Sequence, residues 1–283
     1  MRAVAALGIV LGVALTAFRG APLHAQQRAD TLRLGGLRQP VEVLRDRWGI
    51  NHIYARSTHD LFFAQGYLAA RDRTFQLELW RRQATGTMSE LLGRRELKRD
   101  AGARLFRYRG NMATELAHYH PEGAAIVHAF VEGVNALVDL AARDSSLVPV
   151  ELRMLGAVPG RWTDEVVISR HQGLLGNIGQ ELSNGRFVAT QGAALLRKIS
   201  WFHPGPDPLL EIDPAVLRAG LDAPILELYD AFRAPVRFVP ADLKVAVRNK
   251  ASGARALAAL NATGAPALAA LNDSLDRELP SRR

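Results

Sequence analysis

Few side chains in this sequence stand in a pattern that could carry out covalent chemistry unaided. There is no cysteine, which excludes a thiol nucleophile, a disulfide and a zinc ribbon. Neither the G-x-S-x-G turn that exposes a nucleophilic serine nor the H-E-x-x-H pair of zinc hydrolases is present. His118 and His120 are spaced wrongly for one helix face, and the other histidines are dispersed. Residue types alone therefore indicate no self-contained active site.

A glycine repeat marks the one helical segment with unusual spacing. In the predicted helix 163–182, capped by Thr163, glycines recur every three residues at positions 173, 176 and 179. Each glycine costs a helix up to about 1 kcal/mol relative to alanine. We therefore expect a compensating feature: tight packing, a break in the helix, or space for a ligand.

The elements that must position these residues are mostly helical. Alternating apolar residues on both sides of a Trp48–Gly49 turn predict a hairpin within residues 41–55. Ser57, three residues before Asp60, has the spacing of a helix cap, and Gly86 is a natural stop. A long helix is therefore predicted between Ser57 and Gly86.

Two further helices are predicted. Residues 121–144 carry an apolar stripe, with Pro121 at the first helical position and Gly133 on the stripe. A glycine there indicates close approach of another backbone. Residues 223–232 form one short helix.

The amino-terminal residues and the distribution of charge indicate where the protein acts and which partners it has. The first 25 residues have the basic start, apolar run and small-residue end of a signal peptide, so the protein is expected to be periplasmic or secreted. An uncleaved anchor stays open, although the run is short for a membrane span. The formal charge of +8 comes from scattered arginines without interleaved aromatics, which argues against a nucleic-acid partner.

A long run of residues resembles a known family. Residues 41–93, VEVLRDRWGINHIYARSTHDLFFAQGYLAARDRTFQLELWRRQATGTMSELLG, are similar to the amino-terminal signature of the penicillin acylases, also called penicillin amidases. Later matches are Glu132 to Asn135, Pro149 with Glu151, and Pro159 to Trp162. The resemblance covers residues 38–200. It divides the chain into a signal peptide (1–25), an α-chain-like helical domain (26–202), a proline-rich spacer-like segment (203–248) and an alanine-rich end (249–283) that is either weak helix or disordered tail.

The resemblance implies a fold and a reaction. Members are exported precursors that cut themselves into a helical α chain and a larger β chain, which together form an αββα N-terminal-nucleophile hydrolase. The β chain begins with the nucleophilic serine, whose free amine acts as the base for hydrolysis of a side-chain amide. By resemblance, this chain is the α-chain portion: mainly α, with a short amino-terminal β-hairpin.

The resemblance offers an explanation for the many charged residues in the predicted helix 57–86. A helix buried between two chains needs paired charges, since breaking a buried ion pair costs about 3–5 kcal/mol. We expect five residues to pair internally or with a β chain: Asp72, Arg73, Glu78, Arg81 and Arg82. Solvated helix charges are the alternative.

The sequence departs from the family at the nucleophile. No serine follows a glycine, and Ser183, which precedes an asparagine, follows leucine, so no catalytic residue is assigned. This chain is therefore expected to hydrolyse amides only together with a β chain that supplies the nucleophilic serine. The alternatives are a non-catalytic exported helical binding protein and a decayed fragment.

Three site residues are carried over from the resemblance. Leu175 and Gly179 take positions that line the acyl pocket, although glycine for helix packing is an equal alternative at position 179. Glu181 falls near the family's calcium ligand; otherwise it is a surface acid at a helix end. Calcium takes six to eight oxygens, so a β chain would have to complete the site.

Overall fold

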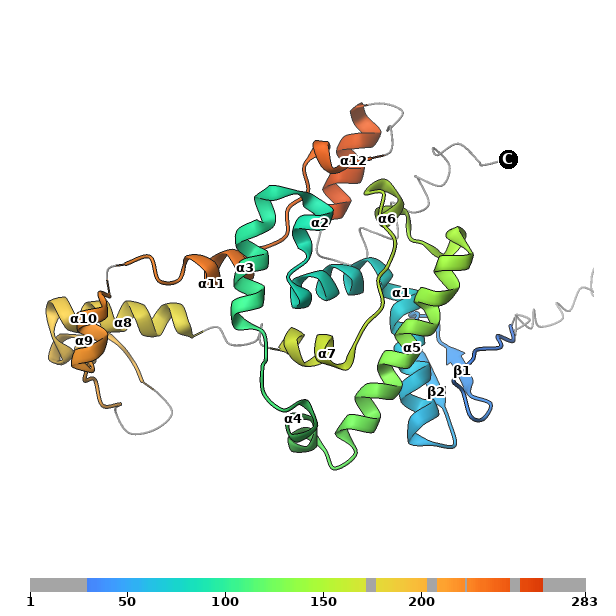
Figure 1. The fold of residues 1–283 in the computed structure, drawn as a ribbon, viewed down its shortest axis with the longest axis horizontal. Helices are drawn as coiled ribbons and strands as arrows, with labels where there is room; N and C mark the ends of the chain where they lie inside the picture. Colours follow the sequence, from blue (N-terminus) through green and yellow to red (C-terminus); the bar gives the residue numbers. More distant parts are fainter. Residues whose placement is uncertain (1–29, 172–176, 203–207, 222, 245–249, 262–283) are drawn as a thin grey trace, which may run out of the picture. The chain divides into compact units, whose positions relative to one another are not determined.

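The structure is a computed structural model that describes residues 30–171, 177–202, 208–221, 223–244 and 250–261 (Figure 1). The residues from Gly35 onward form one compact unit, which contains all the regular elements described. Those elements are β1 (Glu42–Arg45), β2 (Asn51–Tyr54), α1 (Thr58–Thr85), α2 (Met88–Leu92), α3 (Leu97–Phe106), α4 (Met112–Tyr119), α5 (Gly123–Arg143), α6 (Val150–Met154), α7 (Asp164–His171), α8 (Ile178–Gln191), α9 (Ala193–Ile199), α10 (Pro214–Ala219), α11 (Glu227–Arg233) and α12 (Lys250–Asn261), with short 3-10 turns between some of them. The expectation of a mainly helical chain with a short hairpin is confirmed.

The hairpin pairs β1 with β2 in antiparallel register, with Leu44 opposite His52. Its turn contains Gly49 at φ 79°, a left-handed conformation that favours glycine. One face of the ribbon reaches α1, because Arg45 and Asn51 both donate to the Asp72 carboxylate, at 2.9 and 3.0 Å. The predicted hairpin and turn are therefore confirmed.

Helix α1 begins and ends where its capping residues predict. The Ser57 hydroxyl accepts the N–H of Asp60, and Gly86 closes the helix in the left-handed region at φ 64°. Arg73 has non-helical dihedral angles and marks a kink within the helix. Next to it, the Thr74 hydroxyl donates to the Ala70 carbonyl. This side-chain hydrogen bond competes with the backbone N–H for the same carbonyl, which bends helices.

Helices α1 and α5 pack along each other at two glycines. A Cβ atom placed on Gly133 would lie 1.9 Å from the carbonyl oxygen of Phe63, and one placed on Gly66 would lie 2.0 Å from that of Phe130. The close backbone approach predicted at Gly133 is therefore confirmed. Helix α5 is long and apolar enough to cross a membrane by length and composition, and 44% of its most apolar window is buried inside the protein.

The charges of α1 are paired within the chain. Glu78 is buried and accepts from Arg81 at 2.7 and 2.9 Å, from Arg82 at 2.7 Å and from the Gly160 N–H at 2.8 Å. Arg73, by contrast, is exposed and bonds only to the side chain of Gln76 among the interactions of the described residues. Partial burial with internal pairing is the arrangement found.

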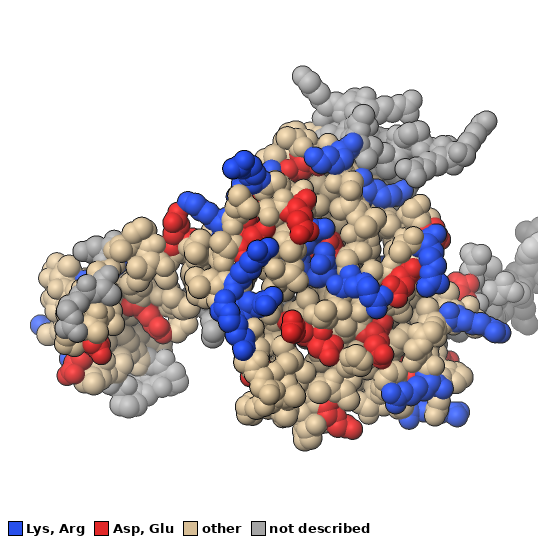
Figure 2. Space-filling model, viewed as in Figure 1, with Lys and Arg blue, Asp and Glu red and all other residues tan. Residues whose placement is uncertain are grey.

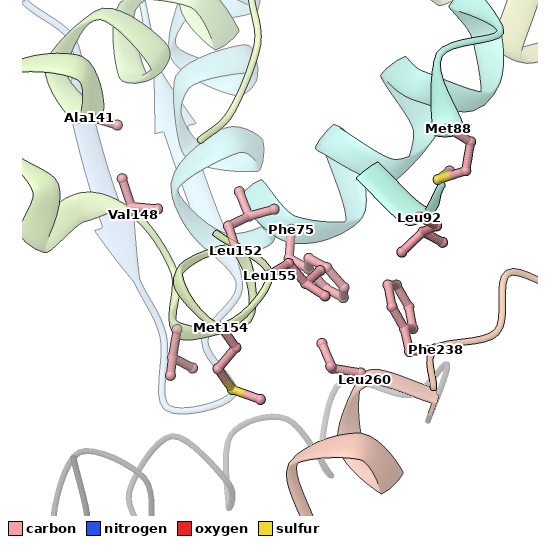
Figure 3. Packing of buried hydrophobic residues seen from close by; sticks show 11 residues of the cluster. Phe75, Met88, Leu92, Ala141, Val148, Leu152, Met154, Leu155, Phe238 and Leu260 are labelled. Atoms are coloured by element: carbon pink, nitrogen blue, oxygen red, sulfur yellow. The ribbon is translucent and has the colours of Figure 1, made fainter. Parts of the chain in front are cut away.

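The buried apolar cluster joins residues that are far apart in the sequence, from Phe75 to Leu260 (Figure 3). Phe238 lies against Phe75 of α1, with ring centroids 5.9 Å apart, and Leu260 of α12 belongs to the same cluster. Residues 250–261 form helix α12, whose Leu260 side chain is buried in this cluster. The domain boundaries predicted at residues 203 and 249 stay predictions.

Two predicted helix boundaries are wrong. The segment 163–182 contains the end of α7 at His171 and the start of α8 at Ile178, and α8 continues to Gln191. Pro121 lies in a turn before α5 instead of at its first position. Gly173 and Gly176 lie outside the described residues, as does the signal peptide.

Candidate functional site

Of the three residues assigned by resemblance, the structure describes Gly179 and Glu181. Leu175 lies outside the described residues. Gly179 is exposed in the first turn of α8, and a Cβ atom there would have no neighbour within 4 Å. Glu181 is exposed, and its Oε1 atom accepts a hydrogen bond from the Asn177 amide. The pocket and calcium assignments therefore stay predictions.

A calcium site would need oxygen ligands that the described residues do not bring together. Within the described ranges, no three His, Asp or Glu residues lie close enough to hold a metal ion. Glu181 has the hard oxygen donors that calcium prefers, but one carboxylate supplies only a fraction of the required ligands. Among the described residues, Glu181 therefore fits the role of one calcium ligand out of the several that the ion needs.

The described residues do form an open cleft of about 760 Å³ beside α5. Phe63, Val131 and Ala136 contribute apolar side chains to it, and Glu132, Asp139 and Asp164 contribute carboxylates. The loop on its far side is held in place by Asn135, whose amide pairs with both the N–H and the carbonyl of Trp162, at 2.8 and 3.0 Å. Two motifs that are far apart in sequence, 132–135 and 159–162, therefore meet at this cleft.

A chain of histidines and carboxylates starts at this cleft, which His128, Glu132 and Asp164 line, and continues beyond it to His59 and Asp60. His59 of α1 lies between two carboxylates, with Nδ1 3.2 Å from Asp60 and Nε2 3.0 Å from Glu132. His128 lies 3.7 Å from Glu132 and 3.3 Å from Asp164 at the start of α7. Because a neutral imidazole has only one N–H, His59 donates to both neighbours only when it is protonated.

Asp60 is the buried end of this network, with no exposed surface. Burial by itself would raise the pKa of its carboxyl group. Hydrogen bonds from the Arg38 N–H, the Ser57 hydroxyl and His59 outweigh that effect and lower the pKa below its usual value. Asp60 is therefore a charged anchor for the start of α1.

The network contains no activated nucleophile. The Ser57 hydroxyl donates to Asp60 at 2.8 Å, and both nitrogens of His59 already face carboxylates. A serine nucleophile needs a base that can accept its proton, and Ser57 donates only to the Asp60 carboxylate, whose lowered pKa makes it a weak base. The arrangement therefore ties α1, α5 and α7 together, but it does not form a hydrolase triad.

Sequence reasoning missed this network. A signal was available in the spacing of His128 and Glu132, four residues apart on one helix face. Their meeting with His59 and Asp164 depends on tertiary contacts. On the face in Figure 2, acidic and basic side chains are interspersed.

Comparison with known proteins gives one family match. The family model described as penicillin amidase matches residues 40–282. That range includes the hairpin, the α1–α5 pair, the cleft and the segment containing α11 and α12.

Curated relatives are similar over part of their length. The chain is 33% identical to penicillin acylase 2 proenzyme of Pseudomonas sp. (strain SE83) over 76% of this chain and 27% of that protein. It is 29% identical to penicillin G acylase of Escherichia coli over 57% of this chain and 21% of that protein. It is 28% identical to acyl-homoserine lactone acylase QuiP of Pseudomonas aeruginosa over 77% of this chain and 26% of that protein. The chain thus spans about a quarter of the length of these relatives.

A solved structure is also similar. Thermostable penicillin G acylase from Alcaligenes faecalis matches with a TM-score of 0.49 and 26% sequence identity, over 62% of this chain and 98% of the matched chain.

Proposed function

Because the chain belongs to the penicillin amidase family, we propose that it acts as the α-chain-like part of an acylase, which hydrolyses an amide only together with a β chain. The bond cleaved is the linear amide between an acyl group and the amine of a β-lactam or another N-acyl compound. The names of the relatives support this range of substrates, since they include penicillin acylases and acyl-homoserine lactone acylases.

The observation that carries the proposal is the family match, which spans residues 40–282, together with the lack of a serine after any glycine. In the proposed complex, the β chain's amino-terminal serine attacks the amide carbonyl and its free amine accepts the serine proton. Hydrogen-bond donors stabilise the oxyanion, the amine leaves, and water releases the carboxylic acid. The α-chain-like part contributes the pocket wall and the supporting helices.

The exposed apolar side chains on the outer face of the hairpin support the proposal that a partner chain binds there. Leu44, Trp48, Ile50 and Tyr54 are 45%, 75%, 58% and 56% exposed. Neighbouring exposed apolar side chains mark interaction surfaces, and a two-stranded ribbon is only marginally stable without further packing. Covering of this face by a β chain would satisfy both requirements.

The finer assignments belong to the same proposal. Leu175 and Gly179 line the acyl pocket, where a small residue at 179 leaves room for a long or bulky acyl group. Glu181 supplies one carboxylate to a structural calcium ion whose remaining ligands come from the β chain. The protein is exported by its first 25 residues and acts in the periplasm or outside the cell.

Co-expression tests the proposal. Residues 26–283 are produced with the β-chain part of the Pseudomonas sp. (strain SE83) relative, and hydrolysis of chromogenic N-acyl amides is measured. We expect the two chains to copurify and to be active only together. A β chain with its amino-terminal serine changed to alanine should copurify without activity.

Three outcomes would contradict the proposal. Enzyme-like hydrolysis by residues 26–283 alone would show that the nucleophile lies within this chain. Failure to bind the β chain, combined with stabilisation by small acyl compounds, would favour the non-catalytic binding protein. Failure to bind, combined with rapid proteolysis in the cell, would favour a decayed fragment.

A further inference from the structure

The segment that the resemblance marks as a removable spacer supplies part of the core. Residues 227–244, called the strap below, contain α11 and the extended stretch after it. Within the strap, Tyr229, Phe238 and Asp242 are only 9%, 4% and 6% exposed. A segment held loosely between two chains would not bury an aromatic ring in the main apolar cluster (Figure 3).

Helix α3 presents a surface shaped for the strap. A Cβ atom on Gly102 would lie 2.2 Å from the Leu228 carbonyl oxygen, so only glycine permits this approach of α11. Phe106, at the end of α3, contacts Tyr229 edge-on at 5.5 Å and Phe232 at 6.3 Å between ring centroids. These contacts place the apolar face of α11 against α3.

Two arginines then bind the extended part of the strap. Arg99 is 5% exposed and donates to the carbonyl oxygens of Phe232, Ala234 and Pro235, at distances from 2.6 to 3.2 Å. Arg95 forms two parallel hydrogen bonds to Asp242, at 2.8 and 2.6 Å. Bidentate pairing of this kind fixes geometry as well as charge.

Helix α12 and α6 close the far end of the strap. The Asn261 amide pairs with both the N–H and the carbonyl of Phe238, at 2.9 and 3.1 Å. The Lys244 N–H donates to the Met154 carbonyl at 2.8 Å. The strap is therefore held near both ends and at its centre by side-chain and backbone groups from outside it.

The residues before the strap differ in character. Most of the described residues from 208 to 225 are exposed, including Leu209 at 77% and Ile225 at 56%. A protease could reach this stretch without disturbing the apolar cluster. The boundary between accessible and built-in chain therefore lies near residue 226.

We infer that the surface made by α3, Arg95, Arg99 and the apolar cluster is a peptide-binding site whose occupant is the strap. When the chain is cut between residues 208 and 225, the strap stays bound as a separate, non-covalent chain. Processing of this protein would accordingly leave residues 227–244 in the mature particle. This inference does not depend on amidase activity or on a β chain.

A nicked full-length chain tests the inference. A site for a specific protease is inserted between Leu209 and Leu210 of residues 26–283, and the purified protein is cut and passed over a size-exclusion column. We expect both fragments to elute together after dilution. Elution of the carboxy-terminal fragment by itself, with the remainder folded or aggregated, would overturn the inference.

Matched variants identify the contacts responsible. In the nicked protein, Arg95→Ala should weaken retention of the fragment about tenfold, because two charge-assisted hydrogen bonds are lost. Arg94→Ala, at the exposed neighbouring residue outside α3, should leave retention unchanged. Equal behaviour of the two variants would refute the assigned site.

Hydrogen exchange on the intact wild-type chain provides a measurement that needs no variant. The hydrogen-bonded amides of the strap should exchange as slowly as those of α1. Fast exchange in the strap beside slow exchange in α1 would show that the strap is a loose cover, contrary to the inference.

Discussion

Gly66 and Gly133 lie reciprocally against each other's helices. Gly66 meets the carbonyl of Phe130, three residues before Gly133, and Gly133 meets the carbonyl of Phe63, three residues before Gly66. This symmetry brings the backbones of α1 and α5 into contact. The cleft and the His59–Glu132 contact both depend on this crossing, because each draws residues from the two helices.

Replacement of either crossing glycine should destabilise the protein. For Gly133→Ala we expect a loss of roughly 2–3 kcal/mol in the free energy of unfolding, since the new methyl group forces the two backbones apart. Urea denaturation followed by circular dichroism measures this loss. Gly185→Ala in α8 is the matched control, because its Cβ atom has open space; it should cause no loss and a gain of up to about 1 kcal/mol. Similar losses for both variants would contradict the crossing.

Neutralising Glu78 should be the most damaging change among the acidic residues of α1. Glu78→Gln leaves Arg81 and Arg82 without their shared buried partner, and we expect a loss of roughly 3–5 kcal/mol in unfolding free energy. Glu90→Gln is the control, because Glu90 also contacts Arg82 but is 66% exposed at its side chain, and it should cost less than about 1 kcal/mol. A Glu78 variant as stable as the Glu90 variant would show that the buried pairing carries little stability.

Glu151→Gln should stabilise the protein at neutral pH. Burial raises the pKa of the Glu151 carboxyl group, and its Oε2 atom has no hydrogen-bond partner among the described residues. Because the folded-state pKa lies above the unfolded one, ionisation costs stability as the pH rises above about 4. Thermal unfolding should therefore show a higher melting temperature for the variant at pH 7 and none of this advantage below about pH 4. Glu122→Gln, at an exposed position, should leave the melting temperature unchanged.

Asp242→Asn should show the opposite dependence on pH. Burial by itself would raise the pKa of Asp242, but hydrogen bonds from Arg95 and the Val239 N–H outweigh it and lower the pKa. Its charge therefore adds stability above the unfolded-state pKa of about 4, and this contribution is lost as the pH falls through the folded-state pKa. Denaturation at pH 7 should show the variant to be less stable than wild type, with the difference closing toward pH 2. A difference that is the same at both pH values would indicate a shape effect and not a charge effect.

Local sequence patterns were sufficient to predict the hairpin turn and the ends of the long helix α1 in the amino-terminal half of the fold. Ser57, Gly86 and Gly49 act through their own backbone or the adjacent turn, so their effects could be predicted from sequence spacing alone. The close approach at Gly133 was predictable for a related reason: a glycine on an apolar stripe has few other roles. The glycine-rich segment was less predictable, since the sequence pattern predicted one helix where the structure has α7 ending at His171 and α8 starting at Ile178.

The candidate site was largely beyond the reach of sequence patterns. His59, His128 and Asp164 are far apart in the chain and meet only because α1, α5 and α7 pack together. The pairing of Arg95 with Asp242 spans 147 residues. No local rule connects such positions, because their contact energy depends on the arrangement of the whole unit.

The sequence by itself determined the secondary structure of the hairpin and of the long helices. It was also sufficient to recognise the family and to see that no serine follows a glycine, as the family's nucleophile does. These properties follow from caps, periodicity and residue identity, which act over a few residues. Only the tertiary structure decided that Glu78 is buried with its arginines, that histidines and carboxylates from α1, α5 and α7 meet in one network, and that residues 227–244 complete the core. Burial and long-range pairing are set when distant segments exclude water together, and neither is encoded at any single position.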